Sequence, residues 1–352
     1  MRDAIKDLCL AHIGKYPKTN ERDILKLIFQ GEFGPGHLIQ DEAKSKRYIE
    51  EEYTSISNAE SSEYIEDIGF GFCRLHLCAI DKPGLSVDTL HRLFMLSALS
   101  VSGNNQSFLQ KTETVKELCI DGTLPFSLEK LDAVINAWQK GGYHPFRHSE
   151  AFREAYCPAY RIIKSEYGKF ITLFAKIDKA MKDLPHVILA VDGDAAAGKT
   201  TLSGILNLVY NCSIVPMDHF FLQPEQRNET RLSEPGGNID YERFKNEVSQ
   251  FLISYKPFSY KPFDCQIWGF GKEICVKPNK LTVVEGSYAL HPKLSDIYNI
   301  KVFLSVDEEE QMRRIALRNG PEMSEKFRNI WIPMEKNYHK SFGIQDSCDF
   351  VF

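Results

Sequence analysis

The spacing of apolar residues along the chain changes near residue 183. Up to that point apolar residues recur mainly at helical intervals, over 3–16, 20–30, 41–53, 86–100, 127–139 and 148–181, the last interrupted near Pro158. Only residues 71–80 alternate with a period of two, which places Leu75 and Leu77 on one face and Arg74 and His76 on the other. We therefore expect residues 1–182 to form a mostly α-helical (α+β) domain with one short strand near 71–80.

The second of these helices has recognisable signals at both ends. Asn20 is a suitable N-cap, because its side chain accepts hydrogen bonds from the first free amide groups. Gly31 is expected to end the helix, since the glycine- and proline-rich turn over 31–37 cannot continue it.

Residues 183–352 show a different pattern, in which short apolar strands alternate with helices. The predicted elements cover 186–192, 201–210, 213–217, 240–255, 281–285, 300–306 and 307–319. Such alternation is typical of a parallel sheet covered by helices. The sequence therefore predicts an α/β domain after the mostly helical one.

Composition adds limits to this description. A chain of 352 residues is long enough for two cores, and a net charge of −5 gives no overall attraction to nucleic acid or to an anionic membrane. The nine cysteines are scattered, and no apolar run is long enough to span a bilayer. The first residues are charged rather than signal-like, so we expect a cytoplasmic protein without nucleic-acid or membrane partners, for which both a monomer and a homo-oligomer are compatible with the sequence.

The strongest chemical signal is a glycine-rich loop between a predicted strand and a predicted helix. Its residues are Gly193, Asp194, Ala195, Ala196, Ala197, Gly198, Lys199 and Thr200, followed by Thr201. They fit the P-loop pattern G-x-x-x-x-G-K-[ST], in which main-chain amides and the lysine hold phosphates and the hydroxyl binds Mg²⁺. This predicts a P-loop NTPase-type sheet that binds ATP and Mg²⁺, with Thr201 as a further phosphate contact.

Two carboxylates end neighbouring predicted strands. Asp218 follows the strand at 213–217, and Glu285 ends the strand at 281–285. Ligands of such sheets bind where parallel strands end, so we predict Asp218 as the base that accepts a substrate proton and Glu285 as a metal ligand beside Thr200. A helix N-cap is the alternative role for Asp218.

Arginines supply further candidates. Arg314 and Arg318 lie one helical turn apart and are candidate lid residues that stabilise the transferring phosphate, unless they only form a solvated basic face. Arg227 and Arg231 lie in a predicted loop at the same sheet edge and are candidate substrate contacts, although an ordinary loop role is equally compatible with the sequence.

Taken together, residues 192–352 resemble the uridine kinase and phosphoribulokinase group of P-loop kinases. The resemblance rests on the P-loop, Met217-Asp218-x-Phe-Phe, the segment 238–244, Tyr260 and Glu285-Gly286. It implies that Asp218 is catalytic and that Asp240 and Tyr260 contact the substrate; a helix cap and a packed aromatic are the alternative roles. Uridine kinases have a base-contacting histidine where this chain has Cys265, so strict uridine specificity is not expected.

The expected activity is ATP-dependent phosphorylation of a hydroxyl group on a small metabolite, such as a nucleoside or a polyol. A nucleotide-dependent switch that controls a partner of the first domain is the alternative. The first domain resembles no family that we recognise. Its candidate polar residues are His37, Arg74, His76, the run 143–149, Tyr156 and Arg161, which form either an anion or substrate pocket or ordinary core and interface contacts.

Overall fold

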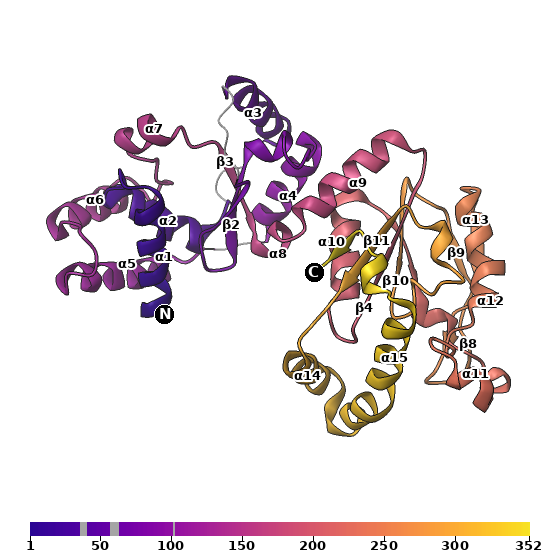
Figure 1. The fold of residues 1–352 in the computed structure, drawn as a ribbon. Coiled ribbons are helices and arrows are strands. Elements are labelled where there is room, and N and C mark those ends of the chain that lie inside the picture. The colour runs from indigo at the N-terminus through magenta and orange to yellow at the C-terminus, as the bar shows by residue number, and fades with distance from the viewer. Residues whose placement is uncertain (36–40, 57–62, 101–102) are drawn as a thin grey trace. The chain divides into compact units, whose positions relative to one another are not determined.

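The computed structural model describes residues 1–35, 41–56, 63–100 and 103–352. The chain separates into two compact units, Met1–Lys176 and Ile177–Phe352 (Figure 1). The division falls within helix α9 (Ile171–Asp183), at whose C-terminal end the sequence places the domain boundary.

The N-terminal unit combines helices with a small antiparallel sheet. Its helices are α1 (Arg2–Lys15), α2 (Glu21–Phe33), α3 (Glu42–Ser55), α4 (Val87–Leu99), α5 (Asn105–Ile120), α6 (Leu128–Lys140), α7 (Glu150–Tyr156) and α8 (Ser165–Gly168), with a 3₁₀ turn η1 (Leu77–Ile80). The sheet has the order β1 (Ile65–Asp67), β2 (Phe72–His76) and β3 (Tyr160–Lys164). The predicted mostly helical character is therefore confirmed.

Helix α2 begins as predicted and ends later than predicted. Asn20 is its N-cap and forms a capping box with Asp23. The expectation that Gly31 ends the helix is wrong, because α2 continues to Phe33 and Gly34 follows it. A Cβ on Gly31 would lie 2.5 Å from the Phe70 ring, so this glycine serves close packing rather than helix termination.

Two further expectations for this unit need correction. The strand predicted over 71–80 is shorter, because it ends at His76 and Leu77–Ile80 forms the 3₁₀ turn. The candidate residue His37 lies outside the described residues. The predicted helical stretch 148–181 contains strand β3, which pairs with β2 in antiparallel register. A run such as Tyr-Arg-Ile-Ile-Lys suits either structure, and pairing with β2 decides it.

The C-terminal unit is built on a five-stranded sheet whose strands all pair in parallel. Its order is β12 (Phe350–Val351), β11 (Ile300–Leu304), β4 (Val187–Gly193), β10 (Leu281–Glu285) and β5 (Ser213–Pro216). Its helices include α10 (Lys199–Tyr210), α11 (Glu229–Ser233), α12 (Tyr241–Phe244), α13 (Gln250–Ile253), α14 (Glu308–Lys326) and α15 (Ile332–Phe342). This is the predicted α/β sheet with flanking helices (Figure 1).

Shorter elements complete the C-terminal unit. They are the hairpins β6 (Phe258–Tyr260) with β9 (Ile274–Val276) and β7 (Phe263–Asp264) with β8 (Gly269–Phe270), the turns η2 (Met217–Phe220), η3 (Pro224–Gln226), η5 (Ser295–Ile297) and η7 (Gln345–Ser347), and the π-turns η4 (Lys245–Ser249) and η6 (Phe327–Trp331). The helix predicted over 240–255 is thus interrupted by η4. No helix among the described residues is both long and apolar enough to cross a bilayer.

The strands β4, β10 and β5 end at the same level of the sheet, because of the register in which they pair. Glu285 at the end of β10 pairs with Val191 of β4 on one side and with Pro216 of β5 on the other. Strands β4 and β10 are buried along their whole length, because both faces of a parallel sheet are covered, and Thr282 is their one polar residue before the strand ends. The polar residues that follow β4, β10 and β5 therefore emerge side by side.

Candidate active site

The loop between β4 and α10 has the geometry of an anion cradle. Gly193 has φ of 140°, and a Cβ there would lie 2.1 Å from the Leu304 carbonyl oxygen, so only glycine fits. Gly198 (φ 104°) leads directly into the 12-residue helix α10. The first amide groups of a helix have no partner within the helix. The start of α10 therefore offers free N–H groups at the end of this loop, which is the arrangement that binds phosphate in other proteins.

Lys199 lies folded over this loop. Its Nζ donates to the carbonyl oxygens of Gly193 at 2.8 Å and Asp194 at 2.9 Å. The ammonium group is thus held next to the cradle that the sequence predicted. It supplies positive charge where main-chain amides already favour an anion.

The hydroxyl and carboxylate predicted to serve a metal ion lie next to each other. Thr200 Oγ1 is 3.4 Å from Glu285 Oε1 and 3.3 Å from Oε2. Burial, followed by the negative charge of Asp218, raises the pKa of Glu285. Oxygen ligands and mutually repelling carboxylates are the surroundings that a hard divalent cation stabilises, so these residues fit Mg²⁺.

Asp218 lies in turn η2, directly after β5. Its side chain is exposed, and the N-cap of η2 is Pro216, with no side-chain capping bond. The helix-cap alternative is therefore not realised. Gly286 (φ 136°) allows the close approach, since a Cβ there would lie 3.0 Å from Met217 Cβ and 3.6 Å from Asp218 Oδ1.

Asp192, which the sequence analysis did not select, fixes the base of the site. This fully buried carboxylate accepts hydrogen bonds from the amides of Gly193 (2.7 Å), Tyr288 (3.2 Å) and Leu290 (2.9 Å), and from Tyr338 Oη (2.9 Å). It therefore ties the loop after β4 to the segment after β10 and to helix α15.

Helices α14 and α15 brace the outer side of the loop. Gln311 donates to the Ala195 carbonyl at 3.0 Å, and buried Glu335 accepts from the Ala195 amide at 3.0 Å. Glu335 also accepts from Ser287 Oγ at 2.6 Å, which links α15 to β10. Asp194 accepts from the Val306 amide at 3.2 Å, so the loop is held from both directions.

The two candidate lid arginines occupy different surroundings. Arg314 donates to the Ala196 carbonyl at 3.1 Å and to Glu310 at 2.7 Å, so its guanidinium lies against the P-loop. Arg318, one turn later, donates to Asn319 at 2.8 Å and lies 6.0 Å from the Phe327 ring. Only Arg314 contacts the loop.

The two arginines predicted to contact the substrate differ in whether their side chains are exposed or already hydrogen-bonded within the protein. Arg227 is exposed and lies 5.3 Å from the ring of Trp268. Arg231 directs its five donors to Glu242, Tyr241 and the carbonyls of Gly237 and Ile239, which leaves none for a substrate. The expectation that Arg231 contacts the substrate is therefore not supported by its surroundings, since its donors hold the segment around α12.

Asp240 and Tyr260 are both buried. Asp240 caps α12 by accepting from the Arg243 amide at 2.9 Å, and it also accepts from Gln226 Nε2 at 2.8 Å. Tyr260 Oη lies 3.0 Å from His219 Nδ1, and burial raises the pKa of Tyr260 to about 12. His219 follows Asp218 in sequence, so Tyr260 reaches the site through this histidine. Cys265 is exposed.

Solved structures that resemble this chain correspond to about half of it, the C-terminal part. No protein-family model matches the chain. Similar solved structures include a possible uridine kinase from Bacillus stearothermophilus, with 17% identity, TM-score 0.42, and coverage of 53% of this chain and 99% of that one. A proposed fructose transport system kinase from Silicibacter sp. TM1040 has 20% identity and TM-score 0.40, covering 51% and 97%.

A deoxyadenosine kinase from M. mycoides is also similar, with 15% identity, TM-score 0.24, and coverage of 47% of this chain and 90% of that one. The similar structures are thus P-loop kinases that correspond to about half of the chain, and the N-terminal unit is not recognised.

Proposed function

We propose that residues 183–352 form an ATP- and Mg²⁺-dependent kinase that transfers the γ-phosphoryl group to a hydroxyl group of a small metabolite. The observation that carries this proposal is the contact between Thr200 and Glu285 beside Asp218, at the aligned ends of β4, β10 and β5. Phosphoryl transfer needs a phosphate cradle, a cation site and a proton acceptor at one place.

In this proposal the loop 193–201 and Lys199 hold the phosphates of ATP, while Thr200 and Glu285 hold Mg²⁺. When bound, the ion neutralises charge on the phosphate oxygens. Asp192 and Glu335 keep the loop in shape through its amides, so little rearrangement is required when the nucleotide binds.

Asp218 is the proposed proton acceptor. As the substrate oxygen attacks the γ-phosphorus, its proton passes to the Asp218 carboxylate, and the bond between the phosphorus and the ADP oxygen breaks. Arg314 already contacts the loop through the Ala196 carbonyl, and exchanging that partner for a phosphate oxygen would let it stabilise the transferred group. Arg318 is the reserve candidate for this role.

The acceptor is proposed to be a nucleoside or a polyol-like molecule. Arg227, Asp240 and Tyr260 are proposed contacts, with Tyr260 acting through His219. Cys265 lacks the hydrogen-bonding capacity of an imidazole, which argues against a strictly uridine-specific pocket.

An acceptor screen with Asp218→Asn tests the proposal. Metabolite-stimulated ADP release should fall by about 10²- to 10⁴-fold, because the amide cannot accept the proton, while ATP affinity measured by calorimetry changes little. Asp296→Asn, at an exposed aspartate of η5, is the matched control.

Two results would contradict the kinase proposal. Slow ATP hydrolysis that no acceptor stimulates would favour the nucleotide-dependent switch. Loss of ATP binding in Asp218→Asn, but not in the control, would make Asp218 a structural residue.

A further inference from the structure

The N-terminal unit contains a cavity of about 670 Å³ that plays no part in the proposed kinase site. Helix α3 provides one wall, which includes the carboxylates of Glu51 and Glu52, and α2, α4, β3 and the segments on either side of α7 provide the others. The polar side chains on the latter walls are Lys26, Gln30, His148, Tyr160 and Arg161. A cavity of this volume accommodates a small metabolite.

A chain of hydrogen bonds leads from Arg74 to residues that line this cavity. The donor and the acceptor of each bond can be assigned by starting from Arg74, whose guanidinium has no acceptor atom. Buried Arg74 can only donate, and it donates to Gln30 Oε1 at 3.2 and 2.7 Å. The Gln30 amide nitrogen must then face Tyr160, and it donates to Tyr160 Oη at 3.0 Å. Tyr160 is therefore left to donate its own hydrogen elsewhere.

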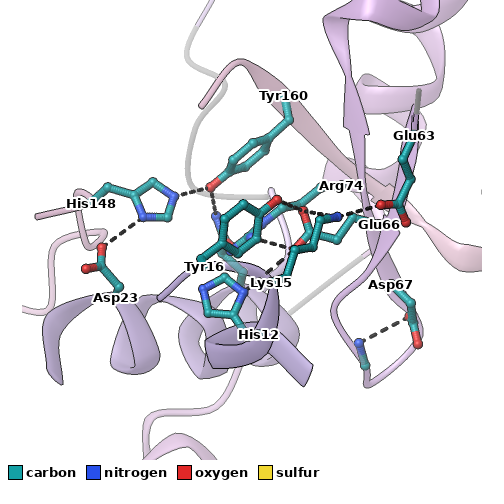
Figure 2. Close-up of polar contacts among 12 residues, drawn as sticks. His12, Lys15, Tyr16, Asp23, Glu63, Glu66, Asp67, Arg74, His148 and Tyr160 are labelled. Atoms are coloured by element: carbon teal, nitrogen blue, oxygen red, sulfur yellow. Dashed lines mark hydrogen bonds and ion pairs between the residues drawn. The ribbon is translucent and has the colours of Figure 1, made fainter. Parts of the chain in front are cut away.

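His148 accepts that hydrogen. Its Nε2 lies 2.6 Å from Tyr160 Oη, and its Nδ1 lies 3.0 Å from Asp23 Oδ1, as Figure 2 shows. Asp23 also accepts from the Ser149 amide at 2.9 Å and from Ser149 Oγ at 2.6 Å. Nδ1 must therefore carry the proton, and Tyr160 Oη, which belongs to the lining of the cavity, keeps one lone pair without a partner among the described residues.

The charges of the neighbouring groups support this assignment. Burial lowers the pKa of His148 to about 4, so the ring is neutral at physiological pH. Burial would raise the pKa of Asp23, but the hydrogen bonds from His148 and Ser149 outweigh it and the pKa is lowered. The network therefore contains an ionised Asp23, a neutral His148 and a neutral Tyr160.

Lys26 is a cation at this cavity that forms no ion pair with the described residues. Its Nζ donates to the Phe146 carbonyl at 2.7 Å, and within the described residues no carboxylate is in ion-pair range of it. The nearby Asp23 is already engaged by His148 and Ser149, while Arg161 is paired with Glu52 at 2.7 Å. A partly buried ammonium group without a counter-ion is stabilised by an anionic ligand.

Among the charged groups that line the cavity, Arg161 is paired with Glu52 and Glu51 is exposed to solvent, whereas Lys26 is partly buried and has no ion-pair partner among the described residues. Here one helix face of α2 presents Asp23, Lys26 and Gln30 together, and only Asp23 and Gln30 are needed to orient the residues behind them. Lys26 and the free lone pair of Tyr160 remain available to a ligand.

We propose that this cavity binds a small hydroxylated anion, with its carboxylate or phosphate group at Lys26 and a hydroxyl group donating to Tyr160. The ligand site is separate from the P-loop. Arg74, Gln30, His148 and Asp23 are positioning residues, because they fix Tyr160 as an acceptor without contacting the ligand.

Calorimetric titration of the full chain tests this proposal, using Lys199→Ala to weaken phosphate binding at the P-loop. The probes are malate, glycerol 3-phosphate and inorganic phosphate. We expect malate or glycerol 3-phosphate to bind with Kd of about 1 mM or tighter. The probe that binds distinguishes a carboxylate from a phosphate ligand.

Three variants in the same background identify the site. Lys26→Met should weaken binding at least about tenfold, equivalent to about 1.4 kcal/mol, and Lys140→Met, at an exposed lysine of α6, should not. Tyr160→Phe should weaken binding of the hydroxylated probes and leave any inorganic phosphate binding unchanged. Lys26→Arg keeps the charge and should retain binding if Lys26→Met fails to fold.

The proposal is overturned if none of the probes binds at about 10 mM, or if Lys26→Met and Lys140→Met bind them equally. Wild-type ATP binding is measured in parallel. Because that measurement depends on the P-loop alone, failure at this cavity is distinguishable from failure of the proposed kinase.

Discussion

At the scale of single residues, the account depends on a few buried carboxylates whose partners are main-chain amides. Asp192 is the clearest example, since four donors from three separate segments converge on it. Removing part of its acceptor capacity leaves buried donors without partners, which is more costly than losing one exposed hydrogen bond.

Asp192→Asn should therefore destabilise the C-terminal unit by about 2–3 kcal/mol and lower its melting temperature by roughly 5–10 °C. The amide keeps one acceptor oxygen, and its NH₂ group faces donors on the other side. Scanning calorimetry of the full chain measures the change, with Asp296→Asn as control. Equal melting temperatures for the two variants would remove Asp192 from its assigned role.

Lys26 allows a pH-dependent prediction at the same scale. Burial, reinforced by the positive charge of Arg74, lowers the pKa of Lys26 to about 8. Below pH 8 the group is protonated and unreactive toward acylating reagents; above it the free amine reacts, well before an ordinary lysine with pKa near 10.4.

Competitive labelling with acetic anhydride, read by mass spectrometry, should thus show Lys26 reacting with a midpoint near pH 8. Bound malate or glycerol 3-phosphate should raise that midpoint, since an anion stabilises the ammonium form. If the midpoint for Lys26 coincided with that of most other lysines, the partly buried environment beside Arg74 would be contradicted.

At the scale of elements, the site is made by how β4, β10 and β5 end. The turn after β10 and the turn η2 after β5 approach so closely that a Cβ on Gly286 would lie only 3.0 Å from Met217 Cβ, and the φ of 136° at Gly286 also disfavours a side chain. The position of Asp218 relative to Glu285 therefore depends on a glycine that carries no chemistry itself.

Gly286→Ala should displace η2 and lower kcat by roughly 10- to 100-fold, with a smaller effect on ATP affinity because the P-loop is untouched. Gly204→Ala is the control, since Gly204 lies in α10 with no atom within 4 Å of an added Cβ. Steady-state kinetics with an accepted metabolite measure both. Unchanged kcat in Gly286→Ala would mean that the η2 position is not critical.

Elements also show where sequence reasoning succeeds and where it stops. The place of loop 193–200 between a strand and a helix was predictable because the three are contiguous, and the places of Asp218 and Glu285 were predictable because parallel strands end at one edge. Glu335 was not, because it reaches the Ala195 amide from 140 positions along the chain. Strand β3 was also missed, because its extended structure depends on pairing with the distant strand β2 and not on its own residue pattern.

At the scale of the whole molecule, the chain consists of two units, each with its own apolar core and its own polar cluster. The sequence indicated Arg74, His148 and Arg161 as members of a candidate pocket or of ordinary core contacts, and did not decide between the two. Only the fold of the N-terminal unit brings His148 and Arg161 to one cavity and connects Arg74 to it through Gln30.

The central claim is that the main-chain amides of loop 193–201, together with Lys199, bind a nucleoside triphosphate. Calorimetric titration of the full chain with ATP and Mg²⁺ tests it most directly. We predict binding in the micromolar range, about −8 kcal/mol, and a loss of at least about tenfold in Lys199→Ala. The absence of measurable affinity of the wild-type chain for any nucleoside triphosphate would contradict the account.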